Sequence, residues 1–480
     1  MTEVTPLLLG KDLSSYEENT ESVATSGSDE RTPLTSSSDN LTISYQAIGT
    51  TDHTERNGTI FSSVFTLVST MNGGGILSVP FAFQQAGYAV ASSILVFITI
   101  ASAYSAFLII RSKKYCQGKV KNMEDVARVA FGRGGEVIIQ LLIIIMCYLL
   151  TVAYLILFVD QMQPLTLFAA GPTSIWTKKV TLLSIAFLVV FPLCLLKDMS
   201  ALKYTSLISA VCNLFLCACV AYRSIQSELG GPVNQPSNPV VWDSSSIRGY
   251  LTCIAIIEIL FACHFNVLPM HGELRQQTTS NKRIILVLSW SISFFINAVM
   301  SFFGYFQFRK FTDQVITKNY ANNDIIITCG RAALCCTVLL NFPLLFLPVR
   351  LTLNKMIWGR RMRVTRLMVI LSNDKMDGPN RFTHFMETLL LVITMYLLAY
   401  AIPHITIIWG FVGAVGCTSL MYIVPPVFYL RVRNPSKGDR CKTLCAICLL
   451  VIGVILLVAG LYQAVMNLMH PVHTQSYRKS

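Results

Sequence analysis

Long apolar stretches, separated by short polar or charged connections, occupy the chain from residue 60 to residue 466. A helix that crosses a bilayer needs about 20 consecutive apolar residues, and eleven stretches approach that length. The expected spans are residues 60–83, 88–110, 136–159, 178–196, 203–222, 249–270, 284–306, 326–349, 384–402, 404–430 and 443–466. The ninth and tenth are the least separable, because only Pro403 and its neighbours divide them.

Two of the expected spans contain residues that weaken a helix. The first holds Asn72-Gly73-Gly74-Gly75 in its middle, and each glycine costs a helix roughly 1 kcal/mol relative to alanine. The sixth holds Cys263-His264-Phe265-Asn266 ahead of Pro269. Unwound backbone in hydrocarbon is tolerated where it lines a polar cavity, so both breaks predict a binding site near the midplane. The alternative for the glycines is a small-residue face that packs closely on a neighbouring helix.

The spacing of the breaks predicts a fold class. Five spans lie between the starts of spans one and six, as in two five-helix inverted repeats whose first helices are discontinuous. We therefore expect an all-α integral membrane protein with a five-plus-five, LeuT-like repeat. The exposed end of a broken helix attracts a carboxylate through its N–H groups, and free carbonyls receive an ammonium group or a cation. The expected substrate-binding residues are Asn72, Gly73, Gly74, Gly75, Phe261, Cys263 and Phe265.

The first 58 residues differ in composition from the rest. They are rich in Ser and Thr and carry ten acidic and three basic side chains without a long apolar run, which predicts a disordered tail and no signal peptide. Glu3, Leu7 and Leu8 resemble an acidic dileucine signal, which would bind a sorting adaptor and direct the protein to lysosomes or vacuoles. A plain solvated tail at the plasma membrane is the alternative. We expect a transporter domain over residues 59–468 and a short tail over 469–480.

Charge supports the membrane interpretation and orients the chain. Hydrophobic residues make up 53% and charged residues 13% of the chain, whereas soluble proteins average about 25% charged residues. The net charge of +13 does not indicate a nucleic-acid partner, because the basic residues lie between apolar runs. They concentrate in the connections after spans two, eight and ten, so the positive-inside rule places the N-terminus in the cytosol and the C-terminus outside or in the lumen.

Six strings are similar to segments of one known family, in its order. They are FTLVSTMNGGGILSVPFAFQQAGY, NMEDVARVAFGRGG, FACHFNVLPMHGELR, GYFQFRKFTDQVITKNYANND, NFPLLFLPVR and GFVGAVGCTSLMYIVPPVFYL. The chain resembles the sodium-coupled neutral amino acid transporter family, part of the amino acid/auxin permease group of the APC superfamily. The resemblance implies eleven helices in the inverted-repeat fold and transport of neutral amino acids, such as glutamine, driven by sodium or protons.

The resemblance also implies an ion site. The family's sodium site uses an Asn early in the first helix and a Thr in the eighth, and Ser69 and Asn341 stand at these positions here. Hydroxyl and amide oxygens suit a hard cation, and Asn72 lies one turn from Ser69. The departures keep proton coupling and uniport open.

Ionisable residues inside spans are costly and often functional. Glu258 is a candidate proton carrier, with a carboxylate reaching lumenal water or pairing with a base as the alternative. His264 is a candidate proton relay or a hydrogen-bonded structural histidine. Arg331 is expected to pair with an acid such as Asp324.

The sequence lacks signals for other function classes. It contains no phosphate-binding G-x-x-x-x-G-K-[ST] motif and no nucleophile motif, so we expect neither transport driven by hydrolysis nor an enzyme. Cys445 and Cys448 lie in an apolar span without further ligands, so no metal site is expected. Beside the secondary transporter we consider an amino acid receptor that signals through the N-terminal tail, and third a channel.

Overall fold

The computed structural model describes residues 58–116, 120–195, 203–229, 239–372, 381–402, 405–433 and 440–469. These residues are helical apart from short connections, and an isolated β-bridge pairs Gly58 with Leu274. The helices are α2 (Ile60–Met71), α3 (Val79–Ala86), α4 (Tyr88–Tyr115), α5 (Met123–Ala170), α6 (Lys179–Cys194), α7 (Lys203–Glu228), α8 (Ile247–Ile259), α9 (His264–Glu273), α10 (Thr279–Phe308), α11 (Ile325–Ser372), α12 (Arg381–Ala401), α13 (Ile405–Phe411), α14 (Val424–Val432) and α15 (Arg440–Met469).

Short helical segments join several of these helices. The 3-10 segments are η1 (Gly74–Ser78), η2 (Ile175–Thr177), η4 (Arg309–Phe311) and η5 (Ile316–Asn319). Two π-helical segments, η6 (Val412–Cys417) and η7 (Ser419–Ile423), lie between α13 and α14. The all-helical class is confirmed for the part of the chain that the structure describes.

Helix length and apolarity support a protein that crosses a membrane many times. Nine described helices or joined helix pairs are long enough and apolar enough to cross a membrane. The bent pair of α2 with η1 and α3 forms a tenth if it is counted as one span. The expected fourth span corresponds to α6, which has 16 residues and is shorter than the usual span. The number eleven therefore stays a prediction.

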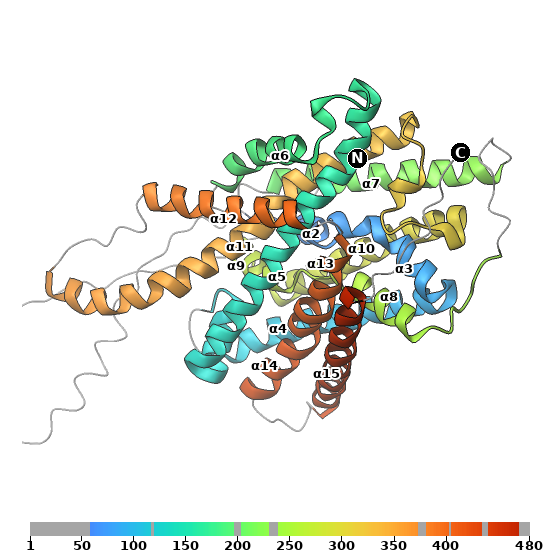
Figure 1. Ribbon diagram of the computed structural model, residues 1–480. Coiled ribbons are helices and arrows are strands. Elements are labelled where there is room, and N and C mark those ends of the chain that lie inside the picture. The colour runs from blue at the N-terminus through green and yellow to red at the C-terminus, as the bar shows by residue number, and fades with distance from the viewer. Residues whose placement is uncertain are drawn as a thin grey trace, which may run out of the picture. The chain divides into compact units, whose positions relative to one another are not determined.

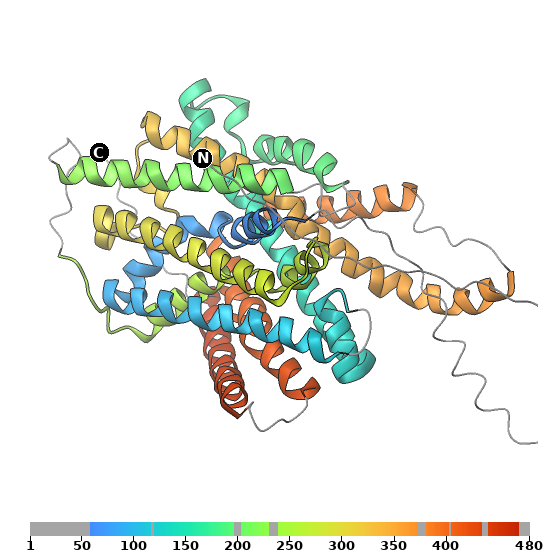
Figure 2. The same cartoon turned by 180° about the vertical axis from the view of Figure 1, so that it is seen from behind.

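Helices near the breaks are buried, and others present apolar surface. The most apolar stretches of α5 and of α8 with α9 are 72% and 78% buried, whereas those of α12 and α15 are 22% buried. The apolar, outward surfaces of α12 and α15 suit contact with lipid. α5 packs against α11, and α10 lies between α7 and α4 (Figure 2).

The broken first span lies among these helices. α2 packs against α7 and α10, and α3 packs against α8 and α10 (Figure 1). Contacts therefore surround the break from α7, α8 and α10, which are far apart in the sequence.

Candidate functional site

The first span unwinds where its glycines predict. α2 ends at Met71, Asn72 has φ −93° and ψ 38°, and Gly73 has φ −64° and ψ −139°. The chain resumes as η1 and α3 at an angle of 44° to α2. The first N–H groups of a helix have no partner within that helix, so those at the start of η1 can point to a ligand.

The same glycines allow close packing on α5. A Cβ atom on Gly73 would lie 1.6 Å from the Tyr154 hydroxyl oxygen, and one on Gly74 would lie 2.1 Å from Leu157 Cδ2. A side chain at either position would overlap α5. Unwinding and close packing, which the sequence presented as alternatives, therefore occur together.

The second break lies one turn earlier than expected. α8 ends at Ile259 and α9 begins at His264, so residues 260–263 form the break, whereas His264, Phe265 and Asn266 belong to the first turn of α9. The prediction that residues 263–266 interrupt the helix was wrong in this respect. The backbone closes tightly: the Cys263 N–H donates to the Phe261 carbonyl at 2.9 Å, and the Asn266 N–H donates to the Cys263 carbonyl at 2.9 Å.

A proline leaves one carbonyl of α9 outside the regular helix pattern. The Phe265 carbonyl would accept from the N–H of residue 269, but Pro269 has none. Phe261, Cys263 and Phe265 are all buried, at 0%, 0% and 4% exposure. The Phe265 carbonyl is thus a buried acceptor that lacks its usual donor within the helix.

The two breaks lie side by side. A Cβ atom on Gly75 would lie 3.1 Å from Leu260 Cδ2 and 3.6 Å from Ile259 Cγ2. The start of η1 therefore contacts the end of α8, where the second break begins. The structure brings both sets of expected substrate-binding residues into one region.

The two residues expected at an ion site are in direct contact. The Ser69 hydroxyl donates to Asn341 Oδ1 at 2.6 Å, and Asn341 Nδ2 donates to the Ser69 carbonyl at 3.1 Å. Ser69 is 0% and Asn341 is 1% exposed. α2 and α11 thus place three oxygen atoms together in a buried position next to the first break.

Asn72 faces a different direction. Its Nδ2 donates to Ser293 Oγ at 3.0 Å, and its Oδ1 accepts from Asn297 Nδ2 at 2.7 Å. Its carbonyl accepts from Asn213 Nδ2. The side chain is therefore bound to α10 and the carbonyl to α7, and within the described residues no hydrogen bond links the Asn72 side chain to Ser69 or Asn341.

The sequence interpretation missed Asn213, Ser293 and Asn297. All three are buried in spans five and seven. Amide side chains inside otherwise apolar spans are a usable signal, because buried polar groups in a bilayer need partners. Their pairing with the backbone break requires a contact over more than 140 residues, which local patterns do not predict.

Glu258 lies at the end of α8, closer to the break than expected. Its Oε2 atom is 2.6 Å from Thr418 Oγ1, and its side chain is 1% exposed. Its carbonyl accepts from the Phe261 N–H at 3.1 Å. Among the described residues it pairs with no base, so neither the solvent-exposed nor the base-paired alternative describes it.

The chain matches the family described as "Transmembrane amino acid transporter protein" over residues 56–466. This match covers most of the chain. The chain belongs to this family. The transporter is thus a multi-pass membrane protein rather than an enzyme, as the sequence predicts.

Two comparisons extend this result. The transporter is 23% identical over 433 residues to the sodium-coupled neutral amino acid symporter 2 of Danio rerio, and the alignment covers 85% of this chain and 82% of the relative. Its fold is similar to that in the crystal structure of MhsT in complex with L-phenylalanine, with a TM-score of 0.53 at 11% identity. That likeness covers 84% of this chain and 98% of the other, and it shows that the two proteins share an all-helical fold, while the five-plus-five repeat stays a prediction.

His264 occupies a structural environment in the transporter. Its Nε2 donates to the Ser102 carbonyl at 3.2 Å, because a carbonyl can only accept. Trp290 Nε1 donates to the Ser102 hydroxyl at 2.7 Å. The rings of His264 and Trp290 meet edge to face. These contacts tie α9 to α4 and α10 and favour the structural histidine.

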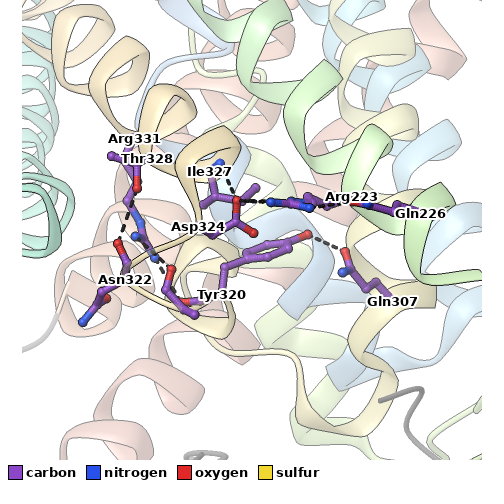
Figure 3. A network of polar contacts seen from close by, with 10 residues as sticks. Arg223, Gln226, Gln307, Tyr320, Asn322, Asp324, Ile327, Thr328 and Arg331 are labelled. Atoms are coloured by element: carbon purple, nitrogen blue, oxygen red, sulfur yellow. Dashed lines mark hydrogen bonds and ion pairs between the residues drawn. The ribbon is translucent and has the colours of Figure 1, made fainter. Parts of the chain in front are cut away.

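Arg331 does not pair with Asp324, so that expectation was wrong. Asp324 Oδ1 accepts from Arg223 Nε at 3.1 Å and from Arg223 Nη2 at 2.7 Å (Figure 3). Arg331 Nη2 instead donates to the carbonyls of Thr317 and Tyr320, at 2.7 and 3.1 Å. The connection between α10 and α11 is therefore attached to both α7 and α11.

Some predictions concern residues outside the described ranges. These are the sorting residues Glu3, Leu7 and Leu8, almost all of the two tails, and the Pro403 region between spans nine and ten.

Proposed function

We propose that this transporter moves a neutral amino acid, such as glutamine, by alternating access at the two breaks, coupled to a sodium or proton gradient. The observation that carries the proposal is the contact between the breaks, with Gly75 against Leu260 and a buried pair of oxygen-bearing side chains nearby. The name of the Danio rerio relative supports both the substrate class and the sodium coupling.

Backbone groups at the breaks match an amino acid zwitterion. The N–H groups of Gly73, Gly74 and Gly75 would bind the substrate carboxylate at the start of η1. The carbonyls of Phe261, Cys263 and Phe265 would receive the ammonium group. Both functions use the backbone, so the substrate needs no charged side chain, and the aromatic rings would shape the pocket for its side chain.

The Ser69–Asn341 contact supports a sodium site. Sodium is a hard cation and prefers oxygen ligands, which the Ser69 hydroxyl, the Ser69 carbonyl and Asn341 Oδ1 supply. The ion would replace the hydrogen bond between the two side chains. α2 leads into the first break, so it would move during alternating access. The ion would then link α2 to α11.

The remaining architecture is part of the same proposal. We infer eleven spans in two inverted five-helix repeats, a transporter domain over residues 59–468 and tails over 1–58 and 469–480. The family match over 56–466 supports these bounds. The basic connections support a cytosolic N-terminus. There Glu3, Leu7 and Leu8 would bind a sorting adaptor for the lysosomal or vacuolar membrane, with the plasma membrane as the alternative.

Uptake by the purified protein tests the function. Proteoliposomes would be given labelled glutamine under an imposed sodium gradient, an imposed pH gradient or neither. Saturable uptake that rises under one gradient is expected. The absence of saturable flux for any neutral amino acid under every condition would contradict the proposal and favour the receptor, whereas flux without saturation would indicate a channel.

A further inference from the structure

The π-helical segment, which we define as residues 412–423, lies directly against α8. π-helical turns are rare and occur frequently at functional sites. A Cβ atom on Gly413 would lie 2.4 Å from the Ala255 carbonyl oxygen, so the two backbones touch there. Glu258 lies less than one turn after Ala255, and its carboxyl group reaches the π-helical segment at Thr418.

The hydrogen atoms at this contact can be counted. Thr418 Oγ1 lies 2.6 Å from Glu258 Oε2 and 3.0 Å from the Gly413 carbonyl oxygen. A hydroxyl group has a single hydrogen to donate, and a carbonyl can only accept. Both contacts are full hydrogen bonds at once only if Glu258 carries a proton and donates it to Thr418, which then donates to Gly413.

Burial also favours the protonated carboxyl group. Glu258 is 1% exposed, and its Oε1 atom has no hydrogen-bond partner among the described residues. An ionised carboxylate with a single hydroxyl partner in an apolar interior is far more costly than the neutral acid.

Among the residues that the structure describes, no positive charge compensates for ionisation of Glu258. The titratable groups that face the carboxyl group are Cys417 and Tyr422 of the π-helical segment, and Cys147 of α5 lies next to Cys417. All three are acids. Within the described ranges, α3, α4, α13 and α15, which also pack against α8, contribute no charged group to this site.

We propose that Glu258 is a proton-binding site that holds α8 against the π-helical segment, and that loss of the proton releases this contact. The inference rests on the proposed transport function and adds a proton site separate from Ser69 and Asn341. Because the Phe261 N–H donates to the Glu258 carbonyl, movement at the end of α8 would reach the substrate carbonyls.

Thermal unfolding of the purified full-length protein gives a readout that does not depend on transport. The proton stabilises the contact, so the melting temperature of the wild type is expected to fall as pH rises through the titration of Glu258. The Glu258→Gln variant keeps a neutral donor toward Thr418 and is expected to lose this component of the pH dependence. Equal pH dependence in both proteins would overturn the proposal.

Thr418 provides an independent test if Glu258→Gln fails to fold. Thr418→Ser keeps the hydroxyl group and is expected to behave like the wild type, whereas Thr418→Val removes it and lowers the melting temperature most at acidic pH. Thr99→Val is the matched control, because within the described part of the chain the Thr99 hydroxyl bonds only the Leu95 carbonyl of its own helix. The proposal is wrong if Thr418→Val and Thr99→Val respond to pH alike.

Uptake of labelled glutamine separates this inference from the proposed function. Wild-type flux is expected to change with pH, with occupancy of a single proton site falling about tenfold per pH unit above its pKa. Glu258→Gln should flatten that change while saturable flux persists. Saturable flux with the same pH profile in both proteins rejects the proton site and leaves the transporter intact; no saturable wild-type flux at any pH rejects the transport function itself.

Discussion

At the scale of single residues, Ser69 and Asn341 provide the sharpest test of the ion site. Each side chain bonds the other, so replacement of either by alanine removes an oxygen ligand. We expect Ser69→Ala and Asn341→Ala each to raise the sodium concentration for half-maximal uptake about fivefold to tenfold, the equivalent of about one hydrogen bond. Ser92→Ala is the control, because its hydroxyl bonds the Tyr88 carbonyl one turn away in the same helix. Unchanged sodium dependence in both variants would exclude Ser69 and Asn341 as sodium ligands.

Gly73 tests the close approach of the first break to α5. A methyl group there would overlap the Tyr154 hydroxyl, so Gly73→Ala is expected to lower the melting temperature and abolish most uptake through an overpacking cost of about 1–3 kcal/mol. Tyr154→Phe removes the nearest atom and should restore part of the loss. Gly134→Ala is the control, since a Cβ atom there meets nothing within 4 Å. Equal effects at the two glycines would contradict the packing argument.

Resemblance and local chemistry predicted part of the site at this scale. Ser69 and Asn341 were expected at one ion site, and they are in contact. Asn213 and Asn297 were missed because their contacts depend on how distant helices pack. Arg331 was given the wrong partner because Asp324 pairs with the distant Arg223, whereas Arg331 bonds nearby carbonyls. A single sequence contains no local signal for such pairs.

At the scale of helices, Pro269 allows a test of the second break. Pro269→Ala would give residue 269 an N–H group, which can bond the Phe265 carbonyl and complete the helix. We expect the melting temperature to stay constant or rise, while the KM for the amino acid increases about tenfold through loss of a bond to the ammonium group. Saturation curves and unfolding of the same preparation measure both. An unchanged KM would exclude the Phe265 carbonyl as a substrate ligand.

The connection between α10 and α11 supplies a second test of an element. Arg223 and Asp324 are 21% and 15% exposed, and their ion pair attaches this connection to α7. Asp324→Asn is expected to lower stability by about 1 kcal/mol or more, whereas Asp160→Asn, which breaks the more exposed pair with Lys318, should cost less than about 1 kcal/mol. Thermal unfolding measures the difference, and reversal of this order would contradict the role given to the Arg223 pair.

The sequence predicted the first break better than the second. Three consecutive glycines mark the first directly. Residues 260–263 are Leu, Phe, Ala and Cys, which also occur inside helices and so do not mark a break. The break was therefore predicted at the polar residues that follow them. The π-helical segment, which packs on α8 and α15, was not predicted from the local pattern.

At the scale of the whole molecule, the difference in composition between the N-terminal tail and the helices allows a test that distinguishes a transporter from an amino acid receptor. The tail carries ten acidic and three basic residues, whereas the family match begins at residue 56. Deletion of residues 1–50 is therefore expected to leave the rate and saturation of uptake unchanged in proteoliposomes, where no sorting occurs. Loss of uptake with intact folding would show that the tail takes part in the transport cycle.

The central claim is that an ion gradient drives an amino acid through the region of the two breaks. Its most direct test is the steady-state ratio of internal to external labelled glutamine in proteoliposomes under a maintained sodium or proton gradient. We expect a ratio above unity, which falls to unity when an ionophore removes the driving gradient and stays at unity in the Gly73→Ala variant. A ratio that stays at unity under both gradients, for every neutral amino acid supplied, would contradict it.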